Sequence, residues 1–324
     1  MTRTSEPVAG LGYHELQRGG RSGVGWSILG VFMALALVFV ILPVVLYALF
    51  LIPYAVSGAD VSAAADRIND NAHATPVTLA YINLTLACAI PVAILLTWLL
   101  HRRRPGWVAS VLGRIRWRWL LTCLGLAVIT LVATVAVGDL LPDTGDTTGT
   151  SGHVVNSFTA QTLGFVLVIL FLTPLQAAGE EYLFRGYLTQ AIGGVIRWRW
   201  VAVLVPAIVF AIFHGLGQDV PVFFDRLAFG IVAGVLVIAT GGLEAGIAMH
   251  VLNNFLAFGA ALAFGSIGDS LTNTSGTWWN IPVTLTQSLV YLALVLWRAR
   301  RNGIATRTAT PLGGADFASA GTRL

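Results

Sequence analysis

The sequence contains no lysine, few charged residues and only two cysteines. Charged residues make up 10% of its 324 residues, whereas soluble globular domains carry about 25%. Apolar residues make up 56% of the chain, and the mean hydropathy is +0.79. This composition excludes an ordinary soluble domain and predicts an integral membrane protein. Both cysteines, Cys88 and Cys123, lie inside apolar runs, which argues against a disulfide framework and against a cysteine-based zinc site.

The apolar runs are about 20 residues long, which predicts transmembrane helices rather than the short alternating strands of a barrel. We predict an all-α polytopic membrane protein with about eight spans. The expected regions are a disordered cytoplasmic N-terminal arm at 1–24, three transmembrane helices within 25–157, a core at 158–265, and a last transmembrane helix with a basic cytoplasmic tail at 266–324. The predicted spans are 26–55, 76–100, 119–141, 158–192, 201–216, 223–240, 243–264 and 278–297.

The basic residues are distributed unevenly between the predicted loops. With the N-terminus inside, sixteen of the 19 basic residues fall in inner segments, which predicts cytoplasmic N- and C-termini. The Arg- and Trp-rich segment 101–119 connects two spans, so we interpret it as a lipid headgroup anchor rather than a nucleic-acid surface. An all-Arg basic set with much Ala and Gly is typical of a GC-rich bacterium, so the expected location is a bacterial cell membrane.

Residues 179–190 place three charged side chains inside the fourth predicted span. A charge at the centre of a membrane helix costs about 2.5–3.5 kcal/mol, so Glu180, Glu181 and Arg185 together cost roughly 7–10 kcal/mol unless they are paired or hydrated. Glu181 and Arg185 are four residues apart on one helical face, and we expect them to pair. Glu180 points about 100° away from that face, so its carboxylate is free for another role.

Two of the six histidines and one asparagine also lie inside predicted spans. His214 falls late in the fifth span, and His250 and Asn254 share one face of the seventh. In one scheme, Glu180, His214 and His250 ligate a divalent metal such as zinc with a bound water. In the other, Glu180 acts as general base toward a water that His214 also holds, and His250 and Asn254 donate to the developing oxyanion. Both schemes hydrolyse an amide.

Three motifs resemble those of the CAAX prenyl endopeptidase and bacteriocin-processing (CPBP, or ABI) membrane proteins. They are Glu180-Glu181-x-x-x-Arg185, Phe210-x-x-x-His214 and His250-x-x-x-Asn254. The resemblance covers about residues 160–260, and three motifs in order on separate helices make it specific. It implies an intramembrane endopeptidase, a hydrolase commonly called a metalloprotease, with its catalytic core at 158–265.

The resemblance also assigns roles to these residues. It implies that Glu180 activates water with His214, that His250 and Asn254 stabilise the oxyanion, and that Glu181 and Arg185 hold the site together. A zinc mechanism and a metal-free glutamate mechanism both stay open. Expected partners are the lipid bilayer and a peptide or membrane-protein substrate, with no nucleic acid. Prenylated peptides are the namesake substrates, but a bacterial host offers leader peptides, signal-peptide remnants or membrane proteins instead.

Two rival functions stay open at this point. The polar cluster could serve a non-proteolytic scaffold or immunity-type partner, and a transporter is a third alternative. The absence of repeat halves with matching broken helices weakens the transporter reading. A Gly-x-Ser-Gly sequence at 149–152 matches a serine-protease motif, but it lies in an outer loop.

Two further expectations concern depth and helix ends. Asp225 and Glu244 fall at predicted helix ends, where headgroup solvation would suffice for them. His214 lies about 20 Å along its helix from Arg199, whereas His250 lies only a turn or two from the inner end of its own helix. The two can meet only if the segment 190–200 dips, or if the fifth helix is tilted or begins later than predicted.

Overall fold

The computed structural model describes residues 10–138, 140, 154–214 and 217–309. Every named element in these ranges is a helix, and seven helices are long and apolar enough to cross a membrane. A bilayer core offers the backbone no hydrogen-bond partners, so helices that satisfy their own backbone are the expected spanning elements. The chain is therefore an all-α, polytopic integral membrane protein, as the sequence predicts. The Gly-x-Ser-Gly sequence at 149–152 lies outside the described residues.

Three of the seven long helices consist of consecutive pieces, and four are single elements. The first comprises α1 (Val24–Ala36), η2 (Leu37–Ile41) and α2 (Leu42–Val56), and the second comprises α4 (Pro76–Ala87), α5 (Ala89–Leu95) and η3 (Leu96–Leu100). The third comprises α7 (Ala160–Phe171), α8 (Thr173–Glu180), η5 (Glu181–Leu188) and α9 (Thr189–Val195). The single elements are α6 (Trp117–Gly138), α11 (Val220–Thr240), α12 (Glu244–Phe264) and α14 (Asn280–Arg301). Shorter elements are η1 (Tyr13–Gly19), α3 (Val61–Asn69), η4 (Pro105–Val108), α10 (Arg199–Phe213) and α13 (Ile267–Thr272).

The predicted fifth span is shorter than expected. Helix α10 has 15 residues and ends at Phe213, rather than running from 201 to 216. Its length is about 22 Å, less than the roughly 30 Å of a bilayer's hydrocarbon core. His214 is therefore the residue that ends this helix instead of one inside it.

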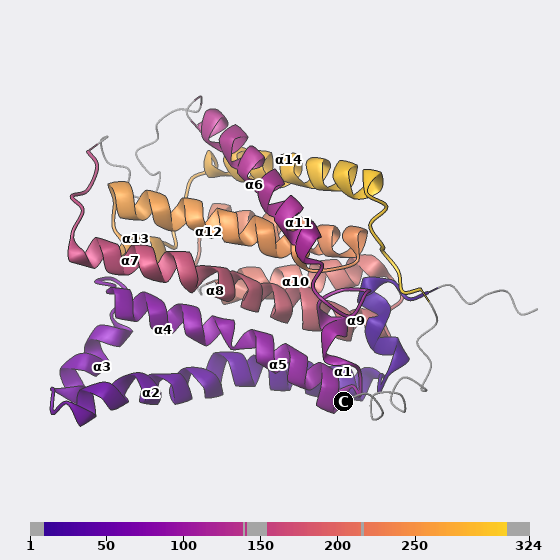
Figure 1. Ribbon diagram of the computed structural model, residues 1–324, viewed down its shortest axis with the longest axis horizontal. Helices are drawn as coiled ribbons and strands as arrows, with labels where there is room; N and C mark the ends of the chain where they lie inside the picture. Colours follow the sequence, from indigo (N-terminus) through magenta and orange to yellow (C-terminus); the bar gives the residue numbers. More distant parts are fainter. Residues whose placement is uncertain (1–9, 139, 141–153, 215–216, 310–324) are drawn as a thin grey trace, which may run out of the picture.

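The long helices lie side by side, with α7, α8 and α9 through the middle of the bundle (Figure 1). Helix α4 packs against α8 on one side and α12 packs against α8 on the other. Helix α6 packs against α12 and α14, and α11 packs against α10 and α14. The described chain ends lie together at one end of the bundle, where η1 contacts α9.

Local signals set the helix ends that position the core. Thr159 caps α7 by accepting a hydrogen bond from the backbone N–H of Thr162, and Asp219 caps α11 in the same way through Val222. Such caps satisfy N–H groups that the first helical turn leaves without partners. Gly241 ends α11 with a φ of 68°, a left-handed conformation that glycine adopts without steric cost. The chain can therefore turn directly from α11 into α12.

The predicted disorder of the N-terminal arm at 1–24 is wrong for its described part. Residues 13–19 form η1, and Tyr13 and Leu16 are buried. The Tyr13 hydroxyl donates a hydrogen bond to the carbonyl oxygen of Val108, and the Arg18 guanidinium donates to that of Gly193. The arm is ordered because its aromatic and basic side chains find apolar and carbonyl partners on the core. Residues 1–9 lie outside the described ranges.

The headgroup-anchor interpretation of 101–119 holds for only some of its residues. Arg102, Arg104 and Arg118 are exposed, as an anchor requires. His101, however, is fully buried and shares a hydrogen bond of 2.7 Å with the Tyr187 hydroxyl. Two arginines are also too buried to act as headgroup anchors. Arg103 is 3% exposed, and the side chain of Arg116 is 10% exposed.

Glu244 also differs from the expectation that lipid headgroups solvate it. Its side chain is 0% exposed, and its carboxylate forms an ion pair with Arg116. The difference arises because the first turn of α12 begins inside the protein. Asp225 is likewise mostly covered, with a side chain that is 20% exposed and 3.9 Å from the Arg226 guanidinium.

Candidate active site

The helix that carries the two glutamates changes its winding between them. Glu180 is the last residue of α8, and Glu181 is the first of the π-helical segment η5. A π-helical stretch is wider than an α-helix and is frequent at functional sites. The Thr189 hydroxyl follows this wider winding, because it donates to the carbonyl oxygen of Phe184, five residues earlier. Both carboxylates are buried, although only Glu181 has a cationic partner within hydrogen-bond distance.

Glu181 is the centre of a buried charged triad. The predicted pair is present: Nη1 of Arg185 donates to Oε1 of Glu181 at 3.0 Å, and both side chains are at most 1% exposed. The same oxygen lies 3.0 Å from Nδ1 of His250. The Arg185 guanidinium also lies over the Phe210 ring, 4.0 Å from its centroid. One carboxylate therefore fixes a residue of its own helix and a residue of α12.

One carboxylate oxygen of Glu180, Oε2, faces two imidazoles. Its Oε1 accepts a hydrogen bond from the Gln176 amide, whereas its buried Oε2 has no hydrogen-bond partner within the described residues. Oε2 lies 3.8 Å from Nε2 of His214 and 3.9 Å from Nε2 of His250. These separations are too long for direct hydrogen bonds.

His214 has a defined tautomer when it is neutral. Its Nδ1 lies 2.9 Å from the carbonyl oxygen of Phe210. A carbonyl oxygen only accepts, so Nδ1 carries the proton and Nε2 offers a lone pair toward Glu180. The His214 side chain is 27% exposed, whereas those of Glu180 and His250 are 6% and 4% exposed. The cluster is therefore most open at His214.

Asn254 lies in the site through a residue that sequence reasoning missed. Its Nδ2 donates to Oε1 of Gln176 at 2.8 Å, and the Gln176 amide in turn donates to Glu180. Gln176 thus joins the Glu180 carboxylate to α12. An amide inside an apolar run, one helical turn before Glu180, was the available signal for this residue.

The positions of Glu180 and His214 along their helices help to explain how the predicted site residues meet. Glu180 lies 15 residues before Val195, and His214 lies 15 residues after Arg199. Helix α10 packs against both α9 and η5, so the two residues, each 15 residues from the connecting turn, come within 3.8 Å of each other. His250 reaches these two residues because α12 starts deep, with Leu243 and Glu244 buried.

The expected zinc ion requires suitable donor atoms at suitable distances from one another. A carboxylate and two imidazoles are suitable donors for zinc. Within the described chain, however, no group of three or more His, Cys, Asp or Glu residues is arranged to hold a metal. The distances of 3.8 and 3.9 Å from Glu180 to the two histidines exceed the roughly 3.3 Å between ligands of a tetrahedral zinc site with bonds near 2.0 Å. The arrangement of Glu180, His214 and His250 therefore does not fit a zinc ion.

Comparisons with known proteins agree with the motifs. Residues 161–256 match the family model described as type II CAAX prenyl endopeptidase Rce1-like. The chain is also 29% identical over 143 residues to the uncharacterized protein YyaK of Bacillus subtilis (strain 168). That alignment covers 41% of this chain and 48% of YyaK, so the chain spans about half the length of this relative. No solved structure matches the chain.

The matched range contains all six residues predicted for the site, from Glu180 to Asn254. The resemblance to the CPBP family is thereby confirmed for this part of the chain.

Proposed function

We propose that this protein is an intramembrane endopeptidase that hydrolyses a peptide bond of a membrane-associated protein or peptide, with Glu180 as the general base. The observation that carries the proposal is the free oxygen of Glu180, which is buried and faces two imidazole nitrogens at 3.8 and 3.9 Å. A buried carboxylate without a cation is costly in a membrane. A catalytic role gives a reason for its presence.

The tautomer of His214 supports the binding of a water beside Glu180. Both Oε2 of Glu180 and Nε2 of neutral His214 are acceptors, so the two repel each other unless a donor lies between them. A water can donate one hydrogen to each. Its oxygen lone pair then points away from both groups and is free to attack a substrate carbonyl carbon. This arrangement binds the nucleophile and orients it.

In the proposed reaction, the water oxygen bonds to the carbonyl carbon while Glu180 takes one of the water protons. The carbonyl oxygen becomes an oxyanion. Two groups can donate to it: the His250 imidazole, which Glu181 holds through Nδ1, and the second amide hydrogen of Asn254. Glu180 then returns its proton to the leaving amine nitrogen as the carbon–nitrogen bond breaks.

The test is turnover of purified protein on candidate leader and signal-peptide substrates. Glu180→Gln keeps the shape of the side chain but cannot accept the proton. We expect its kcat to fall about 10²–10⁴-fold, with little change in KM. The matched control is Glu15→Gln, a carboxylate on η1 that lies outside the proposed site. Wild-type kcat in Glu180→Gln would refute the assignment of the base.

The rival functions give different outcomes in the same set of variants. A scaffold or immunity-type partner predicts no turnover by the wild type and a normal phenotype for the Glu180→Ala/His214→Ala double variant. A transporter predicts gradient-dependent uptake of solute into proteoliposomes. Either outcome, with folded protein, would contradict the endopeptidase proposal.

A further inference from the structure

A second buried ion pair lies at the start of α12, outside the proposed catalytic cluster. The Arg116 guanidinium donates to Glu244 twice, from Nε to Oε1 at 2.9 Å and from Nη2 to Oε2 at 2.6 Å. The backbone N–H of Arg116 also donates to Oε1 at 2.8 Å. The Glu244 side chain is 0% exposed and that of Arg116 is 10% exposed. A pair with two parallel hydrogen bonds has a more fixed geometry than a single contact.

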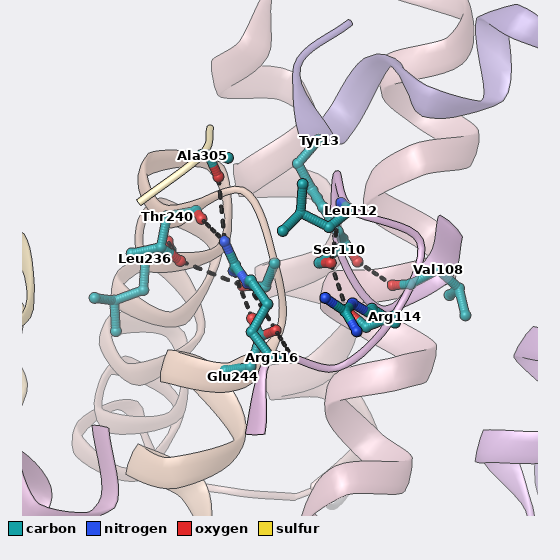
Figure 2. Close-up of polar contacts among 11 residues, drawn as sticks. Tyr13, Val108, Ser110, Leu112, Arg114, Arg116, Leu236, Thr240, Glu244 and Ala305 are labelled. Atoms are coloured by element: carbon teal, nitrogen blue, oxygen red, sulfur yellow. Dashed lines mark hydrogen bonds and ion pairs between the residues drawn. The ribbon is translucent and has the colours of Figure 1, made fainter. Parts of the chain in front are cut away.

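The pair joins three segments that are distant in sequence (Figure 2). Nη1 of Arg116 donates to the carbonyl oxygen of Thr240, the last residue of α11, at 2.9 Å, and to that of Ala305 at 3.2 Å. Next to it, the backbone of 109–111 pairs with 241–243: Val111 donates to Gly241 and Leu243 donates to Ala109, each at 2.9 Å. Arg116 therefore ties the loop before α6 and the segment after α14 to the turn between α11 and α12.

The Arg116–Glu244 pair is connected to the proposed site through the first two turns of α12. His250 lies six residues after Glu244, or about 9 Å along the helix. Between them, Gly246 packs so closely on Glu181 that a Cβ at this position would lie 2.7 Å from Oε2 of Glu181. Glu181 in turn holds Nδ1 of His250 at 3.0 Å. A shift or rotation at the start of α12 would therefore move the His250 ring relative to Glu180.

We propose that Arg116 and Glu244 are a positioning pair that fixes the start of α12, and thereby sets where His250 stands relative to Glu180 and Glu181. The catalytic consequence rests on the proposed endopeptidase function. Two features make this more than ordinary packing. The carboxylate sits in the first turn of α12, where the helix dipole favours a negative charge. Arg116 uses its remaining donors on the backbone of α11 and of the segment after α14, so one side chain sets the relative position of three segments.

The test combines a structural signal with kinetics in detergent-solubilised full-length protein. The ring signals of the six histidines are recorded by NMR after ¹³C-histidine labelling, and that of His250 is assigned with His250→Gln. The variants are Glu244→Gln, Arg116→Lys and the double variant Arg116→Met/Glu244→Leu, which removes both charges. The matched control is Arg18→Lys, because Arg18 also donates to two backbone carbonyls, those of Gly193 and Ile196, at the same end of the bundle.

We expect Glu244→Gln and Arg116→Lys to shift the His250 signal and to lower kcat about 10- to 100-fold, since small displacements of catalytic groups have effects of this size. KM should change less than kcat. The double variant should regain most of the thermal stability, because replacing both members of a buried ion pair is often neutral, yet keep the shifted signal and the low kcat. Arg18→Lys should leave the His250 signal and kcat unchanged.

The outcomes separate this inference from the proposed function. A His250 signal at its wild-type position in folded Glu244→Gln and Arg116→Lys would overturn the positioning role, whatever the protein catalyses. A shifted signal with wild-type kcat, in a preparation where Glu180→Gln is inactive, would overturn the catalytic consequence and leave the proposed function intact. If the wild type cleaves nothing, the proposed function fails, and the NMR signal still decides whether the pair positions His250. A purely structural pair predicts that the double variant recovers both the signal and kcat.

Discussion

Replacing Arg185 tests the charged triad that holds the two motif helices together. In Arg185→Met the stem of the side chain stays, but Glu181 loses a cationic partner at 3.0 Å while its own side chain is 0% exposed. Removing one member of a buried ion pair costs about 3–5 kcal/mol, mainly because the other charge remains buried and uncompensated. At about 1.4 kcal/mol per factor of ten, the folding equilibrium constant should fall roughly 10²- to 10⁴-fold.

Arg185→Lys separates charge from stacking. Lysine keeps a cation for Glu181 but loses the planar group that lies 4.0 Å from the centroid of the Phe210 ring. A desolvated cation–π contact contributes up to about 2 kcal/mol, so this variant should lose about 1–2 kcal/mol. The double variant Glu181→Gln/Arg185→Met removes both members of the pair and should be more stable than Arg185→Met alone.

The assay is reversible unfolding of the purified protein by SDS in mixed micelles, followed by tryptophan fluorescence. Arg226→Met is the matched control, because Arg226 is 39% exposed and lies 3.9 Å from Asp225. At 3.9 Å this partly exposed pair is weaker than a fully buried pair in hydrogen-bond contact, so the control should lose much less stability than Arg185→Met. The reasoning is refuted if Arg185→Met loses no more stability than Arg226→Met.

Three further predictions address other parts of the molecule. In Gly246→Ala the new Cβ would lie 2.7 Å from Oε2 of Glu181. The variant should therefore lose about 1–3 kcal/mol of stability and have a lower kcat. A wild-type melting curve and kcat would contradict this prediction. Burial lowers the pKa of His14 from its ordinary value, so docking of the N-terminal arm should be fully favourable above about pH 6.5 and weaken as the pH falls from there toward the pKa of docked His14. The protection factors of residues 10–20, which correct for the slower intrinsic exchange at low pH, should then fall as the pH falls in the wild type but not in His14→Gln, and equal pH responses would refute the role of His14. Turnover should survive dialysis against EDTA, with metal content measured on the same sample, since Oε2 of Glu180 lies 3.8 and 3.9 Å from the two imidazole nitrogens, farther than two ligands of one tetrahedral zinc ion. Loss of turnover that zinc restores would instead establish a metal requirement.

The sequence predicted the parts of this structure that depend on local chemistry. Apolar runs located the spanning helices, because a bilayer requires long apolar helices regardless of how they pack. The pairing of Glu181 with Arg185 followed from a four-residue spacing on one helix. The prediction that Glu180, His214 and His250 lie together followed from the unfavourable free energy of placing isolated polar groups in lipid.

The parts that were missed depend on packing between distant segments. Arg116 and Glu244 each lie in a stretch typical of the membrane interface. Only the fold shows that the two side chains form a buried ion pair. Likewise, the docking of Tyr13 and Arg18 on the core depends on Val108 and Gly193, which are far away in sequence. The role of Gln176 required the position of Asn254 on a different helix.

The most direct test of the central claim is a comparison of protein termini in host membranes that carry the wild type or Glu180→Gln. Both proteins must be folded and equally abundant. Intramembrane proteolysis predicts new termini that occur only with the wild type, and these termini would also identify the substrates. Identical termini in the two membranes would contradict the assignment of Glu180 as the base of an endopeptidase.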